Sequence, residues 1–346
     1  MCSRAHHYCI FRTDRIGDVV LTLPMAAAIK RAQPDATVSV LAQSYTAPLV
    51  RLSPHVDRVI EIDGRDVSCR KHNAFVDVLR EAHIDTALFA YPRPGLAIAA
   101  WRAGIPARIG SAYRGYSLFF NRRVREHRKD AVRHERDYNL SLLQLAGIKA
   151  GEPSLPLLVI PELLRRKGSA ILQREGIDPS RRFLVFHPGS GGSAKNWSAD
   201  QFGALAARLA GELPGCAIVV TGSASEQALM HRVAAAVPGH AVAMRDTVTL
   251  PELAAVLSLA DLCVANSTGP LHVAAAVGTP VIGLYPFERV CNPVRWGPLG
   301  PDAIALTPEP AQECADCARR SCERHDRMIR IEVETVFAAV LHTLAN

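Results

Sequence analysis

Short apolar runs alternate with amphipathic stretches along the first half of the chain. The apolar runs predict strands at residues 8–13, 37–42, 58–62 and 86–91, and the amphipathic stretches predict helices at 18–32, 72–83, 94–103 and 136–146. Strands that alternate with helices in this way indicate a parallel sheet whose strands are joined by crossover helices.

The second half repeats this alternation. It predicts strands at 183–187, 217–221, 262–266 and 281–285, and helices at 162–175, 199–213, 225–236, 250–259 and 270–277. Residues 147–161 contain three prolines and little charge, so we expect them to link the two halves.

These patterns predict an α/β fold with two doubly wound, Rossmann-like domains that face a cleft. A chain of 346 residues suits two such domains better than one core. We expect an N-terminal domain over residues 1–155, a C-terminal domain over 156–330 and a terminal helix within 331–346.

Composition indicates a globular protein with acidic partners. Hydrophobic residues make up 49% of the chain and charged residues 21%, and the formal net charge is +7. Because aromatic residues are only 6%, we found no base-stacking platform and expect no nucleic-acid partner. With no apolar run long enough to cross a bilayer and no secretory signal, we expect a cytoplasmic location.

The segment 261–285 predicts an anion site between a buried strand and a helix. Ser267, Thr268 and Gly269 fall at the turn, where backbone N–H groups and the positive helix end attract an anion. Pro270 suits the first helical position, and His272 falls in the first turn. The alternative is an ordinary capped strand–helix unit.

A second candidate site is the small-residue segment 187–195. Ser190, Ser193 and Lys195 can bond phosphate oxygens, and its glycines allow the backbone to approach a diphosphate closely. The segment lacks the ending of an ATP-binding P-loop. A plain flexible loop is the alternative, and we expect Trp197 to anchor the loop rather than touch a ligand.

A third motif, residues 11–24, contains Gly17 and Asp18 directly after the loop that follows the first predicted strand, at the start of a predicted helix. From the residues alone, Asp18 is either a helix-capping acid or a catalytic group. Together with 186–197 and 266–272, this motif resembles glycosyltransferase family nine, the ADP-heptose–lipopolysaccharide heptosyltransferases. The resemblance covers most of the chain, in order.

The resemblance implies an inverting, metal-independent transferase of the GT-B type. It implies that Asp18 is the general base, with Asp14 a lesser candidate expected to be solvated. It also implies that the terminal helix packs on an N-terminal, acceptor-binding domain. The donor that it implies is a nucleotide-diphosphate sugar, with ADP-heptose expected. It assigns to this donor Ser190, Ser193, Lys195, Glu226, Ser267, Thr268, Gly269 and His272.

Two of these assignments remain open. Glu226 can bond the donor's ribose or base, or it can serve as a helix-capping acid. Family members that transfer heptose carry Asp where this chain has Ser267, so the identity of the donor sugar is in question.

Residues 122–136 are rich in Arg, Lys and His. A solvated surface is one interpretation. The other is that Arg122, Arg123 and Arg125 bind an acidic glycolipid acceptor such as a lipopolysaccharide core, because arginine binds carboxylates and phosphates with two parallel bonds. Peripheral contact with the inner face of the inner membrane would follow from such an acceptor.

Cys314, Cys317, Cys322 and His325 have metal-ligand spacing in outline. Structural zinc, a redox-dependent disulfide and free thiols all stay open, and no catalytic metal or other cofactor is expected. Two other functions are alternatives. An epimerase or dehydrogenase would need a Gly-x-Gly-x-x-Gly turn that the chain lacks after its first strand, and a basic scaffold would bind acidic glycans without catalysis.

Overall fold

The computed structural model describes residues 4–64, 72–151, 155–192, 194–244, 248–288, 290–308 and 327–345. The chain divides into two compact units, Met1–Val159 and Ile160–Asn346. This boundary falls four residues after the one expected from sequence, within the proline-containing linker. Among the residues described, no helix is both long and apolar enough to cross a membrane.

The first unit is built on a six-stranded parallel sheet with the order β3-β2-β1-β4-β5-β6. Its strands are β1 (His7–Phe11), β2 (Thr37–Gln43), β3 (Arg58–Ile62), β4 (Thr86–Phe89), β5 (Ala107–Ser111) and β6 (Arg122–Val124). Its helices are α1 (Ile16–Val20), α2 (Leu23–Ala32), α3 (Ala47–Val50), α4 (His72–Glu81), α5 (Pro94–Arg102) and α6 (Glu135–Gln144), with short 3₁₀ helices η1 (Gly115–Phe119) and η2 (Arg128–Asp130).

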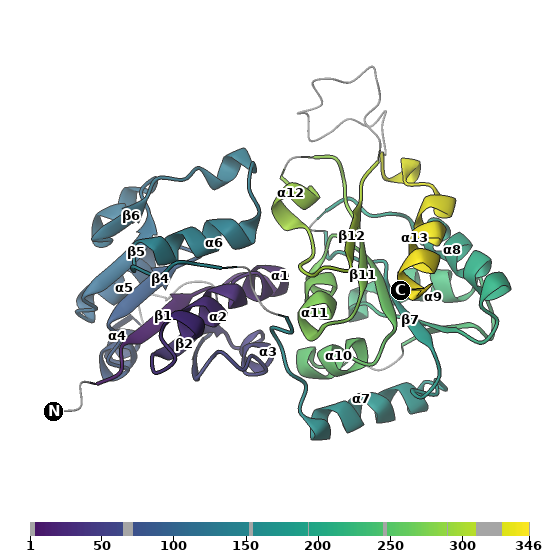
Figure 1. The fold of residues 1–346 in the computed structure, drawn as a ribbon, viewed down its shortest axis with the longest axis horizontal. Helices are drawn as coiled ribbons and strands as arrows, with labels where there is room; N and C mark the ends of the chain where they lie inside the picture. The colour runs from purple at the N-terminus through teal and green to yellow at the C-terminus, as the bar shows by residue number, and fades with distance from the viewer. Residues whose placement is uncertain are drawn as a thin grey trace, which may run out of the picture. The chain divides into compact units, whose positions relative to one another are not determined.

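The second unit repeats this topology with the order β12-β11-β10-β7-β8-β9. Its strands are β7 (Phe183–His187), β8 (Ala217–Val220), β9 (Ala241–Ala243), β10 (Leu262–Asn266), β11 (Val281–Leu284) and β12 (Ala303–Leu306). Its helices are α7 (Glu162–Arg174), α8 (Ala199–Glu212), α9 (Gln227–Ala234), α10 (Leu250–Leu257), α11 (Gly269–Val277), α12 (Pro293–Trp296) and α13 (Val333–Ala345), with 3₁₀ helices η3 (Ala224–Glu226) and η4 (Arg327–Arg330). Figure 1 shows both sheets with their flanking helices. The prediction of two doubly wound domains is confirmed.

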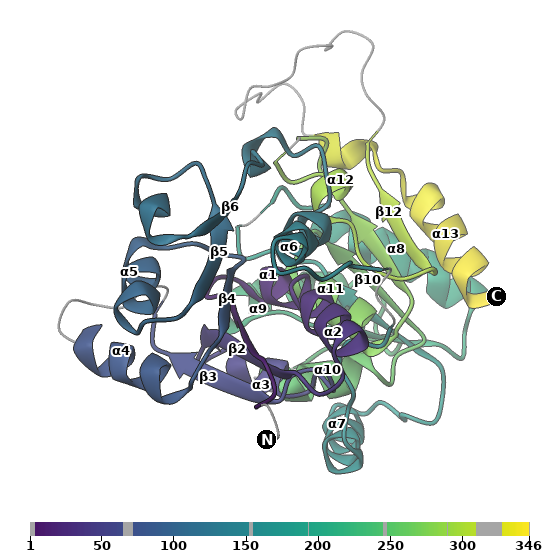
Figure 2. The ribbon, with the colours of Figure 1, turned by 60° about the vertical axis from the view of Figure 1, so that its left-hand side comes forward.

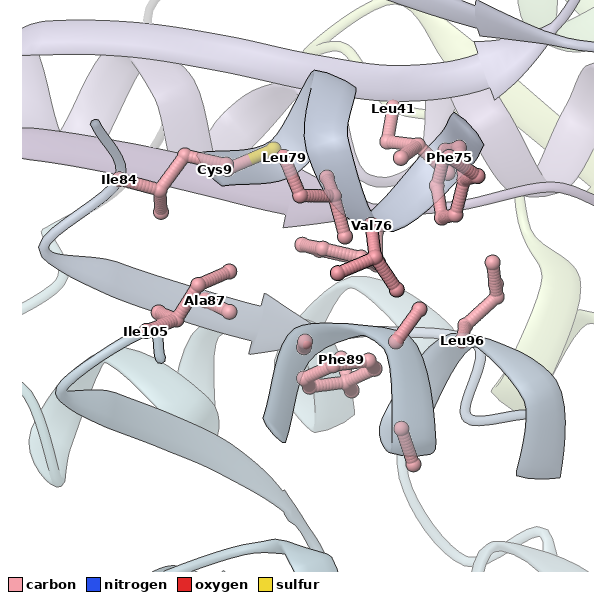
Figure 3. Packing of buried hydrophobic residues seen from close by; sticks show 14 of the residues in the cluster. Cys9, Leu41, Phe75, Val76, Leu79, Ile84, Ala87, Phe89, Leu96 and Ile105 are labelled. Atoms are coloured by element: carbon pink, nitrogen blue, oxygen red, sulfur yellow. The ribbon is translucent and has the colours of Figure 1, made fainter. Parts of the chain in front are cut away.

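The core of the first unit explains why the pattern of apolar residues predicted its strands and helices. Phe11 and Phe89 come from neighbouring strands with ring centroids 4.4 Å apart, and Phe120 adds a third ring 4.7 Å from Phe89. Helix α4 contributes Phe75, Val76 and Leu79, which point into the same cluster (Figure 3). A Cβ on Gly110 would lie 2.5 Å from the Phe120 ring, so only glycine fits at that point of β5.

The helix expected over 18–32 is divided into α1 and α2. Pro24 lies in the first turn of α2, where its missing N–H and its ring are tolerated, whereas a continuous helix would place it in the interior. The Thr22 hydroxyl donates to the Asp18 carbonyl oxygen at 2.8 Å across the break. The break leaves Asp18 on a short helix of its own.

Helix α13 belongs to the second unit and packs against α8 of that unit. Its additional packing on the N-terminal domain stays a prediction. Its buried face carries Val336, Phe337 and Val340. Arg208 of α8 lies over the Phe337 ring, 4.1 Å from its centroid, and its Nε lies 3.1 Å from a Glu334 carboxylate oxygen. The apolar face of the helix is therefore satisfied within its own unit.

Candidate functional site

In the first unit, the sheet reverses its strand order between β1 and β4, and the loops after these two strands carry the candidate catalytic groups. Asp14 and Asp18 follow β1, and Tyr91 and Arg93 follow β4. In open parallel sheets, ligands bind outside the carboxyl ends of the strands at this switch point. The structure therefore brings Asp14 and Asp18 to the position at which such a fold binds substrates.

A buried arginine organises this edge. The Arg12 side chain is only 2% exposed, and its Nε lies 2.7 Å from Asp14 Oδ1. Its Nη2 donates to Asp18, and its Nη1 lies 3.0 Å from Glu135 Oε1. Three carboxylates thus share one guanidinium, whose planar set of donors can serve several acceptors at once. Burial opposes the charged form, but the carboxylates outweigh it and raise the pKa of Arg12 above its usual range.

A second arginine enters the same cluster from the basic segment. Arg128 Nη1 lies 2.5 Å from Glu135 Oε1 and 3.0 Å from Asn139 Oδ1. Asn139 also accepts from Arg12 Nη1 at 3.3 Å and donates to the Leu21 carbonyl oxygen at 3.1 Å. Glu135 therefore links the β1 loop, which carries Asp18, to η2.

Asp14 departs from the expectation that it is a solvated loop acid. The residue is 8% exposed, and its backbone oxygen accepts from the Tyr45 hydroxyl at 2.8 Å. Burial raises the pKa of Asp14 to about 7, helped by the neighbouring Asp18 charge and opposed by Arg12. Asp14 is thus part of the buried cluster and titrates near neutral pH.

This raised pKa predicts a pH-dependent stability. The pKa of Asp14 in the folded protein lies above its ordinary value, so its stabilising contribution is complete below about pH 4 and is lost as pH rises through about 7. Asp14→Asn should therefore gain about 1–3 kcal/mol in free energy of unfolding relative to wild type between about pH 5 and pH 8. Urea unfolding at several pH values measures this difference. For Asp200→Asn, at an exposed acid, the difference from wild type in free energy of unfolding should not depend on pH. If the difference between Asp14→Asn and wild type is equally independent of pH, the raised pKa of Asp14 is contradicted.

The basic segment is not a uniform solvated face. Arg122 and Arg123 belong to the edge strand β6, and Arg125 follows directly at the carboxyl end of that strand. The three side chains are exposed, with Arg122 Nη1 donating to the Leu145 carbonyl oxygen at 2.9 Å. Further along, Arg128 turns inward to Glu135. The segment therefore joins an exposed cationic edge to the buried cluster.

In the second unit, the switch point lies between β7 and β10. The loop after β7 is held there by Asn266, the last residue of β10. Asn266 Oδ1 accepts from the Trp197 backbone N–H at 2.8 Å, and its Nδ2 donates to the Pro188 carbonyl oxygen at 2.7 Å. The Trp197 indole is fully buried and donates to the Ile331 carbonyl oxygen at 2.8 Å. The expectation that Trp197 anchors the loop is confirmed.

Lys195 projects from this loop toward the loop after β11. Its Nζ lies 3.0 Å from Glu288 Oε1, and the Lys195 side chain is 41% exposed. Glu288 was not singled out from sequence, because it lies 93 positions from Lys195 in a segment with no motif of its own. Ser190 is nearly buried and donates to the Ala194 carbonyl oxygen at 3.1 Å. The loop thus presents a partly exposed cation, Lys195, among small residues.

The Glu226 carboxylate accepts hydrogen bonds from two loops. One carboxylate oxygen accepts from the Ser223 N–H at 2.8 Å and the Ser223 hydroxyl at 2.7 Å, which completes a capping box. The other accepts from the Gly191 N–H at 3.1 Å. Burial would raise the pKa of Glu226, but these bonds outweigh it and lower the pKa. The helix-capping role is therefore present in the structure, and Glu226 also ties the β7 loop to the β8 loop.

The turn after β10 has the predicted form. Thr268 is the N-cap of α11 with extended backbone angles, and Gly269 begins the helix, so Pro270 occupies the second helical position rather than the first. Ser267, Thr268 and Gly269 are partly exposed, whereas His272 is 4% exposed. Nearby His187 is neutral, because burial lowers its pKa to about 4, and its Nδ1 bonds the Thr221 hydroxyl at 2.9 Å. Anion attraction at this turn rests on the helix end.

Comparison with known proteins decides the family. A sequence model described as glycosyltransferase family 9 (heptosyltransferase) matches residues 74–326. The chain belongs to glycosyltransferase family 9. It is therefore a glycosyltransferase, as the three motifs predicted.

The sequences of individual relatives agree with this family assignment. It is 30% identical over 296 residues to a Haemophilus influenzae protein named provisionally as a glycosyltransferase, covering 84% of this chain and 85% of the relative. It is 26% identical to lipopolysaccharide heptosyltransferase 2 of Salmonella typhimurium, covering 83% and 81%.

Solved structures show the same fold. A family 9 glycosyl transferase from Veillonella parvula superimposes with a TM-score of 0.85 at 22% identity, covering 100% of this chain and 99% of that one. The E. coli ADP-heptose lipopolysaccharide heptosyltransferase II superimposes with a TM-score of 0.78 at 21% identity, covering 98% of both chains.

Two predictions about the glycosyltransferase lie outside the described residues. Ser193 is one, and the cluster of Cys314, Cys317, Cys322 and His325 is the other. Within the described residues, no three His, Cys, Asp or Glu side chains are placed to hold a metal ion. Cys9, Cys216 and Cys263 are buried, as expected for small apolar side chains, and burial raises the pKa of the Cys216 thiol to about 11.

Proposed function

We propose that this glycosyltransferase moves heptose from ADP-heptose to a lipopolysaccharide core with inversion at the anomeric carbon. The names of its relatives support the donor and acceptor, since both a 26% identical relative and a structural neighbour act on lipopolysaccharide. The proposal is carried by a carboxylate cluster at the switch point of the first sheet and by a small-residue loop with Lys195 at the switch point of the second sheet.

The donor's diphosphate is assigned to the second unit. Backbone amides of the β7 loop, the Ser190 hydroxyl and the N-terminus of α11 offer hydrogen bonds and a positive field, and Lys195 offers a full charge. These groups stabilise the charge that develops on the leaving diphosphate, which removes the need for a catalytic metal. Ser193 and Glu226 are the other donor-binding candidates.

The acceptor is assigned to the first unit. Asp18 removes the proton of the acceptor hydroxyl, and that oxygen attacks the anomeric carbon from the face opposite the diphosphate. The bond between the anomeric carbon and the diphosphate oxygen breaks, and ADP leaves with the electron pair. Arg12 holds the Asp18 carboxylate in place, and Arg122, Arg123 and Arg125 attract the acidic acceptor.

Lys195→Ala should weaken ADP binding by about 1.5–3 kcal/mol, roughly 10- to 150-fold in Kd, because a hydrogen bond to a charged group is lost. Glu288→Gln should instead strengthen ADP binding, since it removes the carboxylate that competes with phosphate for Lys195. Isothermal calorimetry measures both variants, with Lys167→Ala on α7 as the control. Unchanged affinity in Lys195→Ala would show that this lysine serves only its ion pair.

Ser267 tests the identity of the donor sugar. A neutral hydroxyl replaces a carboxylate there, and charged acceptors form roughly twice as strong a hydrogen bond to sugar hydroxyls. Ser267→Asp should therefore change the relative kcat/KM of a panel of nucleotide sugars by about 10-fold or more, while ADP affinity changes less. Ser258→Asp, at the C-cap of α10, is the control. An identical ranking of donors in wild type and Ser267→Asp would place residue 267 away from the sugar and leave ADP-heptose as the donor.

The proposal as a whole is tested by measuring donor binding. ADP and ADP-heptose should raise the melting temperature of the purified protein in proportion to ln(1 + [L]/Kd). A basic scaffold for acidic glycans would be stabilised by the glycan and not by the nucleotide, and that result would replace the proposal.

A further inference from the structure

The positive charge of the chain is concentrated in one segment. Residues 86–125 contain seven arginines and no Asp, Glu, Lys or His. The whole chain has 40 Lys and Arg against 33 Asp and Glu, so the remaining residues are balanced and this segment accounts for the formal net charge of +7. Such a concentration indicates a surface that meets an anionic partner.

The segment forms one side of the first unit. It comprises β4, α5, β5, η1 and β6, and β6 is the edge strand of the sheet. Helix α5 packs against η1, and both views show α5 beside the β5–β6 part of the sheet (Figures 1 and 2). The cations of the segment are therefore gathered on neighbouring elements rather than spread over the unit.

Large apolar side chains are exposed among these cations. Leu118 of η1 is 69% exposed, and Trp101 at the end of α5 is 53% exposed. The Trp101 ring lies 5.5 Å from the Phe119 ring, so α5 and η1 meet at these two rings, and Leu118 directly precedes Phe119 in η1. Arg102 is exposed directly beside Trp101. Solvation of these apolar groups is costly unless a partner covers them.

Arg123 belongs to the same face. It pairs with Gly110 across the β5–β6 ladder, and paired residues on neighbouring strands share a face of the sheet. The face of Gly110 is the one covered by Phe120 and α5, because a Cβ on Gly110 would meet the Phe120 ring. Arg123 therefore lies on the face of the sheet that α5 covers. Arg122 lies on the other face, where it donates to the Leu145 carbonyl oxygen next to α6.

We propose that Trp101, Leu118 and the arginines beside them, Arg102 and Arg123, dock the protein on an anionic phospholipid surface. Indole rings and leucine side chains enter the boundary between headgroups and acyl chains, and arginines pair with the phosphates around them. The aromatic rings suit lipid better than nucleic-acid bases. Trp101 already packs against Phe119, and Tyr113 is stacked on His127 with centroids 3.7 Å apart, which leaves fewer free ring faces for base stacking.

This inference goes beyond the proposed transfer reaction, since lipid binding requires neither donor nor acceptor. The test is flotation of the full-length protein with phosphatidylcholine vesicles that either contain phosphatidylglycerol or lack it, with no glycolipid present. Wild type should float with the anionic vesicles only, and binding should fall as salt is raised. Binding to neither vesicle, or equally to both, would overturn the proposal.

Variants locate the surface. The double variant Trp101→Ser/Leu118→Ser should lower vesicle partitioning roughly 10-fold or more because it removes two inserting groups. Arg102→Glu should lower it roughly 5- to 30-fold, at about 1 kcal/mol for each unit of charge near the membrane. The controls lie on the second unit: Leu163→Ser, at a leucine that is 72% exposed, and Arg181→Glu. If the controls lose as much binding as the variants, the surface lies elsewhere and the proposal is wrong.

Two further measurements separate the alternatives. Brominated lipids should quench Trp101 fluorescence, while the fully buried Trp197 stays unquenched. If a single-stranded oligonucleotide binds more tightly than vesicles and the double variant loses that binding, the surface serves nucleic acid instead.

Transfer to a water-soluble acceptor fragment should be unchanged in the double variant. Failure of transfer with intact vesicle binding would count against the proposed function alone.

Discussion

Asp18→Ala should lower kcat roughly 10²- to 10⁴-fold, the usual range for a lost general base, while the Kd for ADP stays nearly the same. Asp18 lies in the first turn of the short helix α1 at the switch point of the first sheet, and Arg12 holds its carboxylate there. The groups that we propose for donor binding all lie in the other unit, so the loss should appear in turnover and not in nucleotide affinity. Single-turnover kinetics with saturating donor, together with calorimetry, measure both quantities.

Asp200 provides a matched control for the helix-capping alternative. It is also an acid in the first turn of a helix, but it lies on α8, where its side chain is 69% exposed and pairs with Arg232. Both substitutions remove a favourable charge from a helix N-terminus, so a capping role alone would make them equivalent. If Asp18→Ala has near-normal kcat and loses as much stability as Asp200→Ala, Asp18 serves only as a helix cap.

Arg12→Met should lower the free energy of unfolding by about 3–5 kcal/mol at neutral pH, because it leaves Asp18, Glu135 and Asp14 close together without their shared cation. Turnover should fall as well, since Asp18 loses the group that positions it. Arg12→Lys should recover only part of both properties, because one ammonium cannot reproduce the planar set of donors. Urea unfolding and kcat measure the two effects.

Arg128→Met is the comparison variant for this prediction. Arg128 bonds the same Glu135, but its side chain is 24% exposed and water can replace part of its contact. We therefore expect a smaller loss, below about 2 kcal/mol. Equal losses in Arg12→Met and Arg128→Met would contradict the central role of Arg12. The penalty in Arg12→Met should also shrink toward acidic pH, where the carboxylates become protonated.

The alternation of apolar runs and amphipathic stretches predicted most of both sheets, because strands buried on both faces are nearly all apolar. The four strands that sequence missed lie in the outer part of each sheet. In the first unit, β5 contains Arg108 and Gly110, and β6 consists of Arg122, Arg123 and Val124. These strands form by pairing with a neighbour already in place, so their own side chains carry little signal.

Motifs predicted the residues that lie within one loop, and missed the partners that the fold supplies. Arg12 stands 123 positions before Glu135 in the chain, yet their side chains are bonded. The same holds for Lys195 and Glu288, and for Trp197 and Ile331. One signal was available for the first cluster: Arg12 directly follows a buried strand and precedes Asp14 and Asp18, and a buried charge requires partners.

The most direct test is mass spectrometry of a heptose-free lipopolysaccharide core after incubation with the purified protein and ADP-heptose. The proposed function predicts that the core gains one heptosyl residue for each ADP released, and that Asp18→Ala forms product at least about 100-fold more slowly under the same conditions. A core of unchanged mass with every nucleotide sugar tested, or product formed at the same rate by Asp18→Ala, would contradict it.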